Sequence, residues 1–225
     1  MQPSEFVAAV KRGDLDAARS ALGRNPGLAA ARDDAGVSVI CLAVYVGHTE
    51  LAAELARART DLDIFEASCI GDRARVEELL THEPRLVNSR SPDGFQPLGY
   101  ACFFGRSAVF ETLVVRGAEL DAPSDNAMRV RPIHSAVAHA DAGVALSLAR
   151  RLLELGASPN VRQQGGFTPL HEAALRGDAP LVSLLLRHGA DPSARNEADE
   201  SAADLAQRKG HAEIAQSLRT AHPKK

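Results

Sequence analysis

The sequence predicts an all-α fold, a solenoid in which about seven short helix-turn-helix units stack side by side along one chain of 225 residues. Three observations support this prediction: a motif that recurs along the chain, Gly-Ala pairs that close successive copies, and a helix-favouring composition. Alanine and leucine are strong helix formers. Aromatic residues make up only 4% of the chain and Trp is absent, so the core is expected to be aliphatic and rich in alanine.

The recurring motif is clearest at residues 166–174, GFTPLHEAA, a copy that Gly189-Ala190 closes. Gly156-Ala157 closes the preceding copy, and the spacing between these two closing pairs is a period typical of repeat architectures. The other copies are residues 131–137 (RPIHSAV), residues 94–101 (GFQPLGYA), and two weaker ones at residues 36–43 (GVSVICLA) and 201–206 (SAADLA).

Each residue of the motif has a structural reason to occupy its position. The hydroxyl of Thr168 is expected to cap a helix, and Pro169 suits the first helical position, where an N–H has no partner. Gly177 and Gly189 are expected to end the two helices of the unit, because glycine accepts the left-handed conformation found at helix C-termini. The unit is therefore predicted to be two short helices joined by a tight turn and followed by a hairpin loop.

The motif resembles the ankyrin repeat, a unit of about 33 residues with the signature T-P-L-H-x-A. The resemblance covers essentially the whole chain. It implies that His134 and His171 hydrogen-bond to the backbone of neighbouring hairpins. The departures from the pattern are Val39 in place of Pro, Cys41 and Gly99 in place of His, and a connection at residues 140–144 that is longer by a few residues and predicts a bulged loop.

A second relation appears in the first half of the chain. An alignment of the chain with itself that superposes Gly13 on Gly71 also superposes Gly36 on Gly94, which indicates a duplicated two-repeat block. The unit at residues 62–83 lacks the T-P-L-H turn, so its first helix, residues 63–70, is expected to follow almost directly from the unit before it.

The whole chain, residues 1–225, is predicted to form a single domain. Lys224 and Lys225 are expected to form a frayed tail. The predicted repeats lie near residues 4–35, 36–61, 62–93, 94–126, 127–160, 161–193 and 194–221.

Composition and charge argue against several classes of protein. A formal net charge of −3 and a pI near 6.2 do not favour nucleic-acid binding, which calls for a basic domain. No apolar run is long enough to span a membrane, and the N-terminus lacks the features of a secretory signal. Three cysteines, an odd number, favour buried thiols in a reducing compartment, the cytoplasm. The excess of 22 arginines over 4 lysines suggests a GC-rich bacterial genome.

No arrangement of residues predicts catalysis, a cofactor or a metal. The sequence contains no G-x-S-x-G elbow, phosphate-binding loop, H-E-x-x-H or C-x-x-C motif. Cys69 is the only candidate nucleophile that a groove position suggests. The alternative, a small apolar residue that packs between helices, is the expected one. The chain is therefore not predicted to be an enzyme.

The resemblance implies that a partner binds the concave surface, formed by hairpin tips and by the two positions before each helix-ending glycine. Aromatic residues gather at these positions in a chain that is otherwise short of them, and exposed apolar patches mark binding sites. The alternatives are that Phe95 and Phe167 only brace adjacent hairpins, and that Phe103 and Phe104 are partly buried. The predicted partner-binding residues are Val37, Tyr45, Val46, Ile70, Phe95, Phe103, Phe104, His139, Phe167 and Arg176.

The function that the resemblance implies is a non-catalytic protein–protein interaction module, an adaptor or an inhibitor. The partner is expected to be another protein of unknown identity, with no nucleic acid and no membrane, and the chain is expected to be a monomer. The alternatives are a structural subunit that orders a larger complex and, more remotely, an enzyme.

Overall fold

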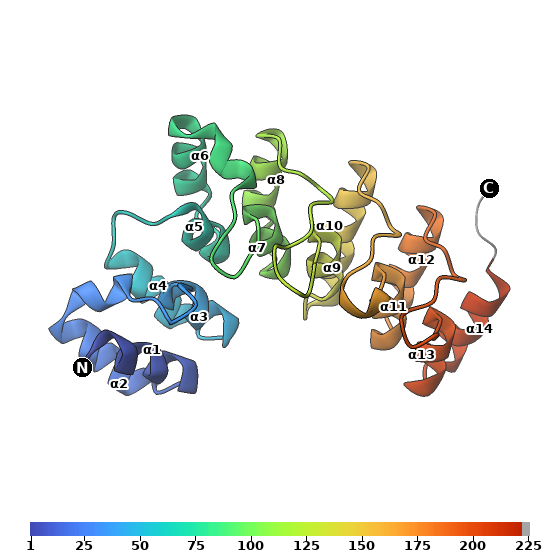
Figure 1. Cartoon of the computed structure of the whole chain (residues 1–225), viewed down its shortest axis with the longest axis horizontal. Coiled ribbons are helices and arrows are strands. Elements are labelled where there is room, and N and C mark those ends of the chain that lie inside the picture. Colours follow the sequence, from blue (N-terminus) through green and yellow to red (C-terminus); the bar gives the residue numbers. More distant parts are fainter. Residues whose placement is uncertain (222–225) are drawn as a thin grey trace. The chain divides into compact units, whose positions relative to one another are not determined.

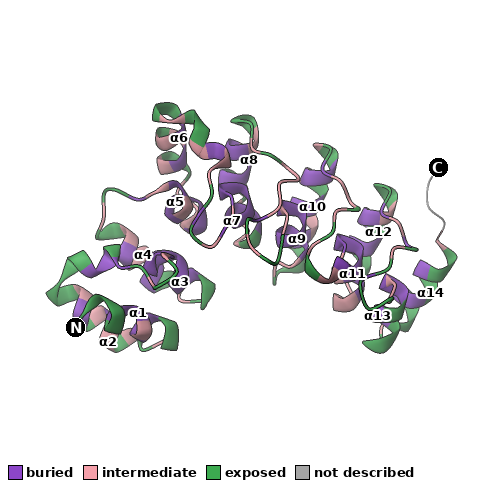
Figure 2. Ribbon diagram, viewed as in Figure 1, coloured by how far each residue is buried: buried purple, intermediate pink, exposed green. Residues whose placement is uncertain are grey.

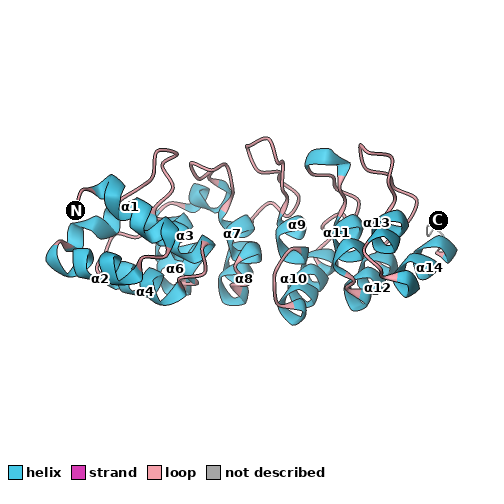
Figure 3. Ribbon diagram, turned by 90° about the horizontal axis from the view of Figure 1, so that it is seen from below, coloured by secondary structure: helices cyan, strands magenta, loops and turns pink. Residues whose placement is uncertain are grey.

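The structure is a computed structural model that describes residues 1–221, and within this range it is helical (Figures 1 and 3). It contains fourteen α-helices and three short 3-10 segments, and its only extended pairing consists of two isolated bridges, Arg32 with Ser38 and Arg195 with Ser201. The predicted all-α fold with seven helix pairs is confirmed over the described residues. Lys224 and Lys225, the predicted tail, lie outside them.

The chain divides into two compact units. In the N-terminal unit, Met1–Ala118, the first helices of successive pairs pack on one another, as do most of the second helices. Figure 2 shows that α3 and α7 are buried along nearly their whole length. The elements of this unit are α1 (Pro3–Arg12), α2 (Leu15–Arg24), η1 (Pro26–Ala30), α3 (Val39–Tyr45), α4 (Thr49–Arg57), α5 (Ile64–Ile70), α6 (Arg73–His82), η2 (Pro84–Asn88), α7 (Pro97–Phe103) and α8 (Ser107–Val115).

The second unit, Glu119–Lys225, repeats the same packing. Its first helices stack in one row, and its connecting loops project from one side of them (Figure 3). Its elements are α9 (Pro132–Val137), α10 (Ala142–Glu154), η3 (Gln164–Gly166), α11 (Pro169–Arg176), α12 (Ala179–Arg187), α13 (Ala202–Arg208) and α14 (Ala212–Thr220).

The histidines of the T-P-L-H motif join neighbouring hairpins. The ring Nδ1 of His171 accepts the N–H of Thr168 at 3.1 Å, and its Nε2 lies 3.2 Å from the carbonyl oxygen of Glu200 in the next hairpin. His134 makes the same two contacts, with the N–H of Arg131 and the carbonyl of Phe167. Both rings therefore accept at Nδ1 and donate at Nε2, and the role that the resemblance implied is present.

The predicted cap of α11 differs in detail. The hydroxyl of Thr168 lies 2.8 Å from Nδ1 of His171, so it contacts the imidazole ring in addition to its place at the start of the helix. Gly177 ends α11 with a φ of 73°, as expected. Its lack of a side chain also matters for packing, because a Cβ at this position would lie only 2.5 Å from the ring of His211.

Arginine side chains provide a second link between hairpins, which the sequence did not predict. Nη1 of Arg162 donates to the carbonyl of Gly166 in its own hairpin at 3.3 Å and to the carbonyl of Arg195 in the next at 2.7 Å. Arg131 donates to the carbonyl of Arg162. Guanidinium groups are suited to this role because their five N–H donors point in fixed directions. The hairpins of the second unit are thus joined by side chains as well as by helix packing.

The connection before α5 is short, as the sequence predicted. Only residues 58–63 separate α4 from α5, and Asp63 begins α5 by accepting the N–H groups of Phe65 and Glu66 at 2.9 and 2.8 Å. Glu66 is fully buried, and its carboxylate accepts from Nη1 of Arg59 at 2.7 Å and from the N–H of Asp63 at 2.9 Å. A buried ion pair therefore fixes the start of the helix that has no hairpin.

The bulged loop predicted near residues 140–144 is wrong. The connection between α9 and α10 is residues 138–141, and α10 runs for 13 residues, compared with 9 in α12. The carboxylate of Asp141 caps α10 by accepting the N–H of Val144 at 2.9 Å. The extra residues mainly extend the helix by about one turn of 3.6 residues, because the sequence of α10 continues its amphipathic pattern.

We expect Glu66→Ala to lower the free energy of unfolding by about 3 kcal/mol, because it removes the buried carboxylate that pairs with Arg59 and accepts the N–H of Asp63. Arg59 then keeps only its pair with the exposed Asp61. Urea denaturation followed by far-UV circular dichroism measures the effect. The control is Glu78→Ala, which removes an exposed pair with Arg75 and should cost about 0.5 kcal/mol. Equal losses in the two variants would contradict the role assigned to Glu66.

The buried histidines predict a dependence of stability on pH. Burial lowers the pKa of His134 to about 4, and it also lowers the pKa of His171. Below about pH 6.5, the usual pKa of histidine, His134 of the unfolded chain takes up a proton, whereas the folded ring stays neutral until the pH approaches about 4. Stability is therefore lost as the pH falls from about 6.5 towards about 4. Between about pH 7.5 and about pH 5.5, His134 should account for about 1 kcal/mol of this loss.

His134→Gln should therefore flatten the dependence on pH by that amount, measured by urea denaturation at both pH values. His188→Gln, at the exposed end of α12, is the matched control and should retain the wild-type dependence. The assignment fails if the two variants lose stability equally on acidification.

Candidate functional site

Four side chains at the C-terminal ends of α3 and α7 form an exposed apolar surface in the N-terminal unit. They are Tyr45, Val46, Phe103 and Phe104, and we call this surface the aromatic platform. The Tyr45 ring lies 5.0 Å from that of Phe104 and 5.9 Å from that of Phe103, and the two phenylalanine rings are 5.1 Å apart. Tyr45, Val46 and Phe103 are exposed at 39%, 40% and 43%, whereas Phe104 is half-buried.

A second layer of rings supports the platform. Tyr100 is almost completely buried, and its ring lies between 6.1 and 6.2 Å from those of Tyr45, Phe65, Phe95 and Phe104. Separations of this size and tilted orientations are favourable for aromatic pairs. The platform is therefore a continuous extension of the hydrophobic core, in which Tyr100 lies, rather than a set of isolated surface residues.

The carboxylate of Asp93 links the platform to the hairpin that precedes α7. Tyr45 donates its hydroxyl to Oδ2 of Asp93 at 3.1 Å, and Tyr100 donates to Oδ1 of the same residue at 2.7 Å. Ser91 donates to that carboxylate as well. Burial of the hydroxyls is the main cause that raises the pKa of both tyrosines, so both phenols stay protonated and act as donors.

The missing hairpin before α5 explains why rings from α3 and α7 meet. Without it, the hairpin that precedes α3 lies directly against the one that precedes α7: a Cβ on Gly36 would lie 3.1 Å from the Cβ of Pro92. Between the two aromatic ends, α5 contributes Cys69, a small residue with no exposed surface. Tyr45 and Phe103 therefore contact each other across α5.

The structure changes the role of some predicted site residues. The prediction that Val37 contacts a partner is wrong. Val37 is only 8% exposed and belongs to the hydrophobic core, because the neighbouring hairpin covers it. Ile70 and Phe95 are half-buried and pack against that core, so they border the platform. Cys69 is fully buried, and burial raises its pKa, which agrees with a packing role and not with a reactive thiol.

The predicted residues of the second unit make contacts of their own. Arg176 donates from Nη1 to the carbonyl of Ala138 at 2.8 Å and from Nη2 to that of His139 at 2.7 Å. The ring of Phe167 lies 5.6 Å from that of His171 in the same repeat, so this contact does not itself brace adjacent hairpins. All three predicted residues are half-buried, so this unit presents no exposed aromatic cluster at these positions.

Sequence reasoning missed Asp93, Tyr100 and Phe65. The sequence carried a signal only for the platform residues themselves, because the alignment of Gly13 on Gly71 also superposes Tyr45 on Phe103 and Val46 on Phe104. It places Tyr45 and Val46 at positions equivalent to those of Phe103 and Phe104, two repeats further along the chain. It does not reveal that they touch, which depends on how closely the units on either side of α5 approach.

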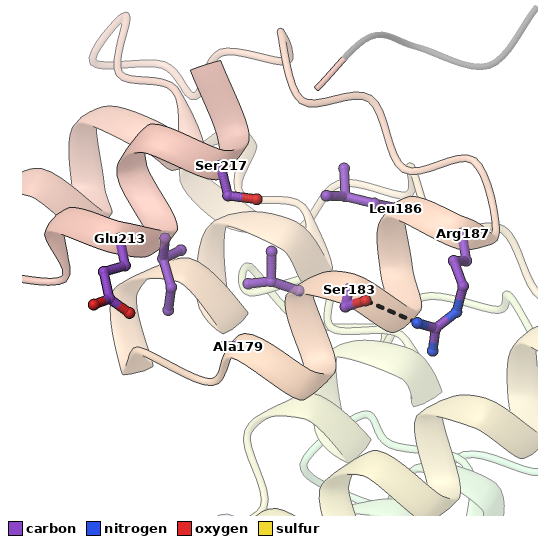
Figure 4. Close-up of a pocket in the computed structure, with 8 residues that line it drawn as sticks. Ala179, Ser183, Leu186, Arg187, Glu213 and Ser217 are labelled. Carbon is purple, nitrogen blue, oxygen red and sulfur yellow. Dashed lines mark hydrogen bonds between the residues drawn. The ribbon is translucent and has the colours of Figure 1, made fainter. Parts of the chain in front are cut away.

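A shallow hollow lies on the outer helices of the second unit, between α12 and α14 (Figure 4). Val182, Leu186 and Ile214 line it, and at its rim Arg187 donates to the hydroxyl of Ser183 at 2.8 Å. Its lining contains no histidine, cysteine or aromatic residue. The aromatic platform is therefore the stronger candidate site.

Two features of the described residues bear on metal binding and on membrane insertion. No group of three or more His, Cys, Asp and Glu side chains gathers in an arrangement that could hold a metal ion. None of the described helices has both the length and the apolar character needed to cross a bilayer. All three cysteines are free thiols and buried.

Comparison with known proteins agrees with the helix pairs. Residues 133–225 match the family model for ankyrin repeats, in three copies. The chain is similar to the putative ankyrin repeat protein YahD of Escherichia coli, with 25% identity over 84% of this chain and 97% of that protein.

Shorter matches of higher identity are found in eukaryotic proteins. They include the human espin-like protein, 46% identical over 31% of this chain, and a probable E3 ubiquitin-protein ligase of rice, XBOS34, 39% identical over 32% of this chain. The chain spans only 7% and 15% of the lengths of these two proteins. The helix pairs, the histidine contacts between hairpins and these matches together show that the chain is similar to ankyrin-repeat proteins, with the family model matching its residues 133–225.

Proposed function

We propose that the chain is a non-catalytic protein-interaction module, an adaptor or an inhibitor, that binds one partner protein at the aromatic platform. Ankyrin repeats generally bind other proteins, and the observation that supports this site is the exposure of Tyr45, Val46 and Phe103 side by side. Aromatic residues are enriched at protein interfaces and carry much of their binding energy. A chain with so few aromatic residues gathers six of them in and beneath this one surface.

The proposal assigns graded roles to the predicted residues. Tyr45, Val46, Phe103 and Phe104 form the centre of the contact, and Ile70 and Phe95 form its border. Phe167, His139 and Arg176 remain proposed contacts of the second unit. We further propose that the protein works as a monomer in the cytoplasm, a reducing compartment that suits its three free thiols.

Phe103→Ala tests the proposal, because Phe103 is the most exposed ring of the platform and its loss leaves the core intact. The partner protein is first identified by affinity capture with the wild-type chain. The dissociation constant of the complex is then measured with both proteins purified. We expect Phe103→Ala to weaken binding by about tenfold or more, which corresponds to about 1.4 kcal/mol.

Val115→Ala is the matched control. Val115 is 82% exposed at the end of α8, a second helix, so its truncation removes exposed apolar surface outside the platform. Far-UV circular dichroism and urea denaturation should show both variants folded. Equal affinity of the two variants for the partner would rule out the platform as the binding site.

A further inference from the structure

The border of the platform toward α1 carries an uncompensated positive charge. Arg12 is the last residue of α1, is exposed, and makes no hydrogen bond or ion pair with another described residue. It precedes Gly13 as Val46 precedes Gly47, so the two occupy equivalent positions on helices that pack together. A Cβ on Gly13 would lie 2.9 Å from the ring of His48, which shows how close the ends of α1 and α3 are.

A second guanidinium, that of Arg106 at the start of α8, is held beside the platform by a backbone carbonyl of α5. Arg106 follows Phe104 by two residues, and its Nε donates to the carbonyl of Cys69 at 2.8 Å. Its aliphatic stem covers Gly71, where a Cβ would lie 3.1 Å from its Cδ. Cys69 lies in the row between Tyr45 and Phe103, so the charge of Arg106 is held next to the exposed rings. No described acidic side chain forms an ion pair with Arg106.

The acidic groups near the platform are already engaged. The carboxylate of Asp33 pairs with Lys11 at 2.7 Å and also accepts the N–H of Val37 at 2.9 Å. Asp93 accepts the hydroxyls of Tyr45 and Tyr100. The chain as a whole is acidic, with 29 carboxylate residues against 26 basic ones. Arg12 and Arg106 therefore place two positive charges at the border of the exposed apolar surface, and no described carboxylate forms an ion pair with either of them.

From this charge pattern we infer that the partner is a protein segment in which an apolar anchor such as leucine or phenylalanine is flanked by carboxylates. The anchor lies on Tyr45 and Phe103, and the carboxylates pair with Arg12 and Arg106. Guanidinium groups suit this pairing because they bind carboxylates through two parallel hydrogen bonds. The inference rests on the proposed function, and it specifies the chemistry of the partner that the proposed function leaves open.

The test uses two synthetic peptides with the same leucine positions, one with glutamate and one with lysine at the flanking positions, titrated into the full chain at low salt. We expect the glutamate peptide to bind about tenfold or more tightly than the lysine peptide. Arg12→Glu should weaken binding of the glutamate peptide by about three- to tenfold, and added salt should reduce the difference. Phe103→Ala should weaken it as well.

Arg57→Glu is the matched control, because Arg57 is also an exposed arginine in the last turn of its helix, α4, away from the platform. Both variants reverse one charge at a helix C-terminus, so their effects on helix stability should be alike. Equal binding of the two peptides, failure of the glutamate peptide to bind, or equal effects of Arg12→Glu and Arg57→Glu would overturn the inference.

The captured partner separates this inference from the proposed function. If its affinity depends on Phe103 but is the same for Arg12→Glu and Arg57→Glu, the carboxylate-flanked anchor is wrong and the platform remains the binding site. If its affinity does not depend on Phe103, the proposed site itself is wrong.

Discussion

Every helix pair in this protein relies on its neighbour to cover its apolar face. A pair of short helices cannot bury that face alone, and in repeat proteins the stability comes from the interfaces between successive units. Within each of the two compact units, first helices pack on first helices and most second helices on second helices. Groups that reach from one hairpin to the next reinforce these interfaces. His134, His171 and Arg162 each hydrogen-bond to a carbonyl in the following hairpin.

The candidate site arises where this regular arrangement is interrupted. Residues 58–63 connect α4 to α5 without a hairpin, and the buried pair of Arg59 and Glu66 stabilises the start of α5 in its place. The flanking hairpins then come together, and the aromatic ends of α3 and α7 meet. An omission in the repeat, rather than an added element, therefore concentrates the aromatic residues on one surface.

The helix pairs and the missing turn before α5 could be predicted from the sequence, because each depends on local signals at a fixed spacing. The hairpin contacts of the histidines are expected only because the motif resembles a known repeat. The burial of Val37 could not be predicted, since its hairpin closely approaches, at Gly36, Pro92 in a hairpin two repeats away. The same holds for the ring contacts of Tyr45 with Phe103 and for the role of Asp93. In α10, the prediction of a loop gave too little weight to an apolar periodicity that continues through the additional residues.

The ties between Asp93 and the two tyrosines have a consequence for recognition. A flexible surface loses side-chain freedom when it binds, at about 0.5–1.5 kcal/mol for each side chain that becomes fixed. The ring of Tyr45 is held by a hydrogen bond at its hydroxyl and by neighbouring rings at its edge, so most of that ordering is complete when the chain folds. The surface is preorganised, and a partner encounters it in nearly the shape that it will have in the complex.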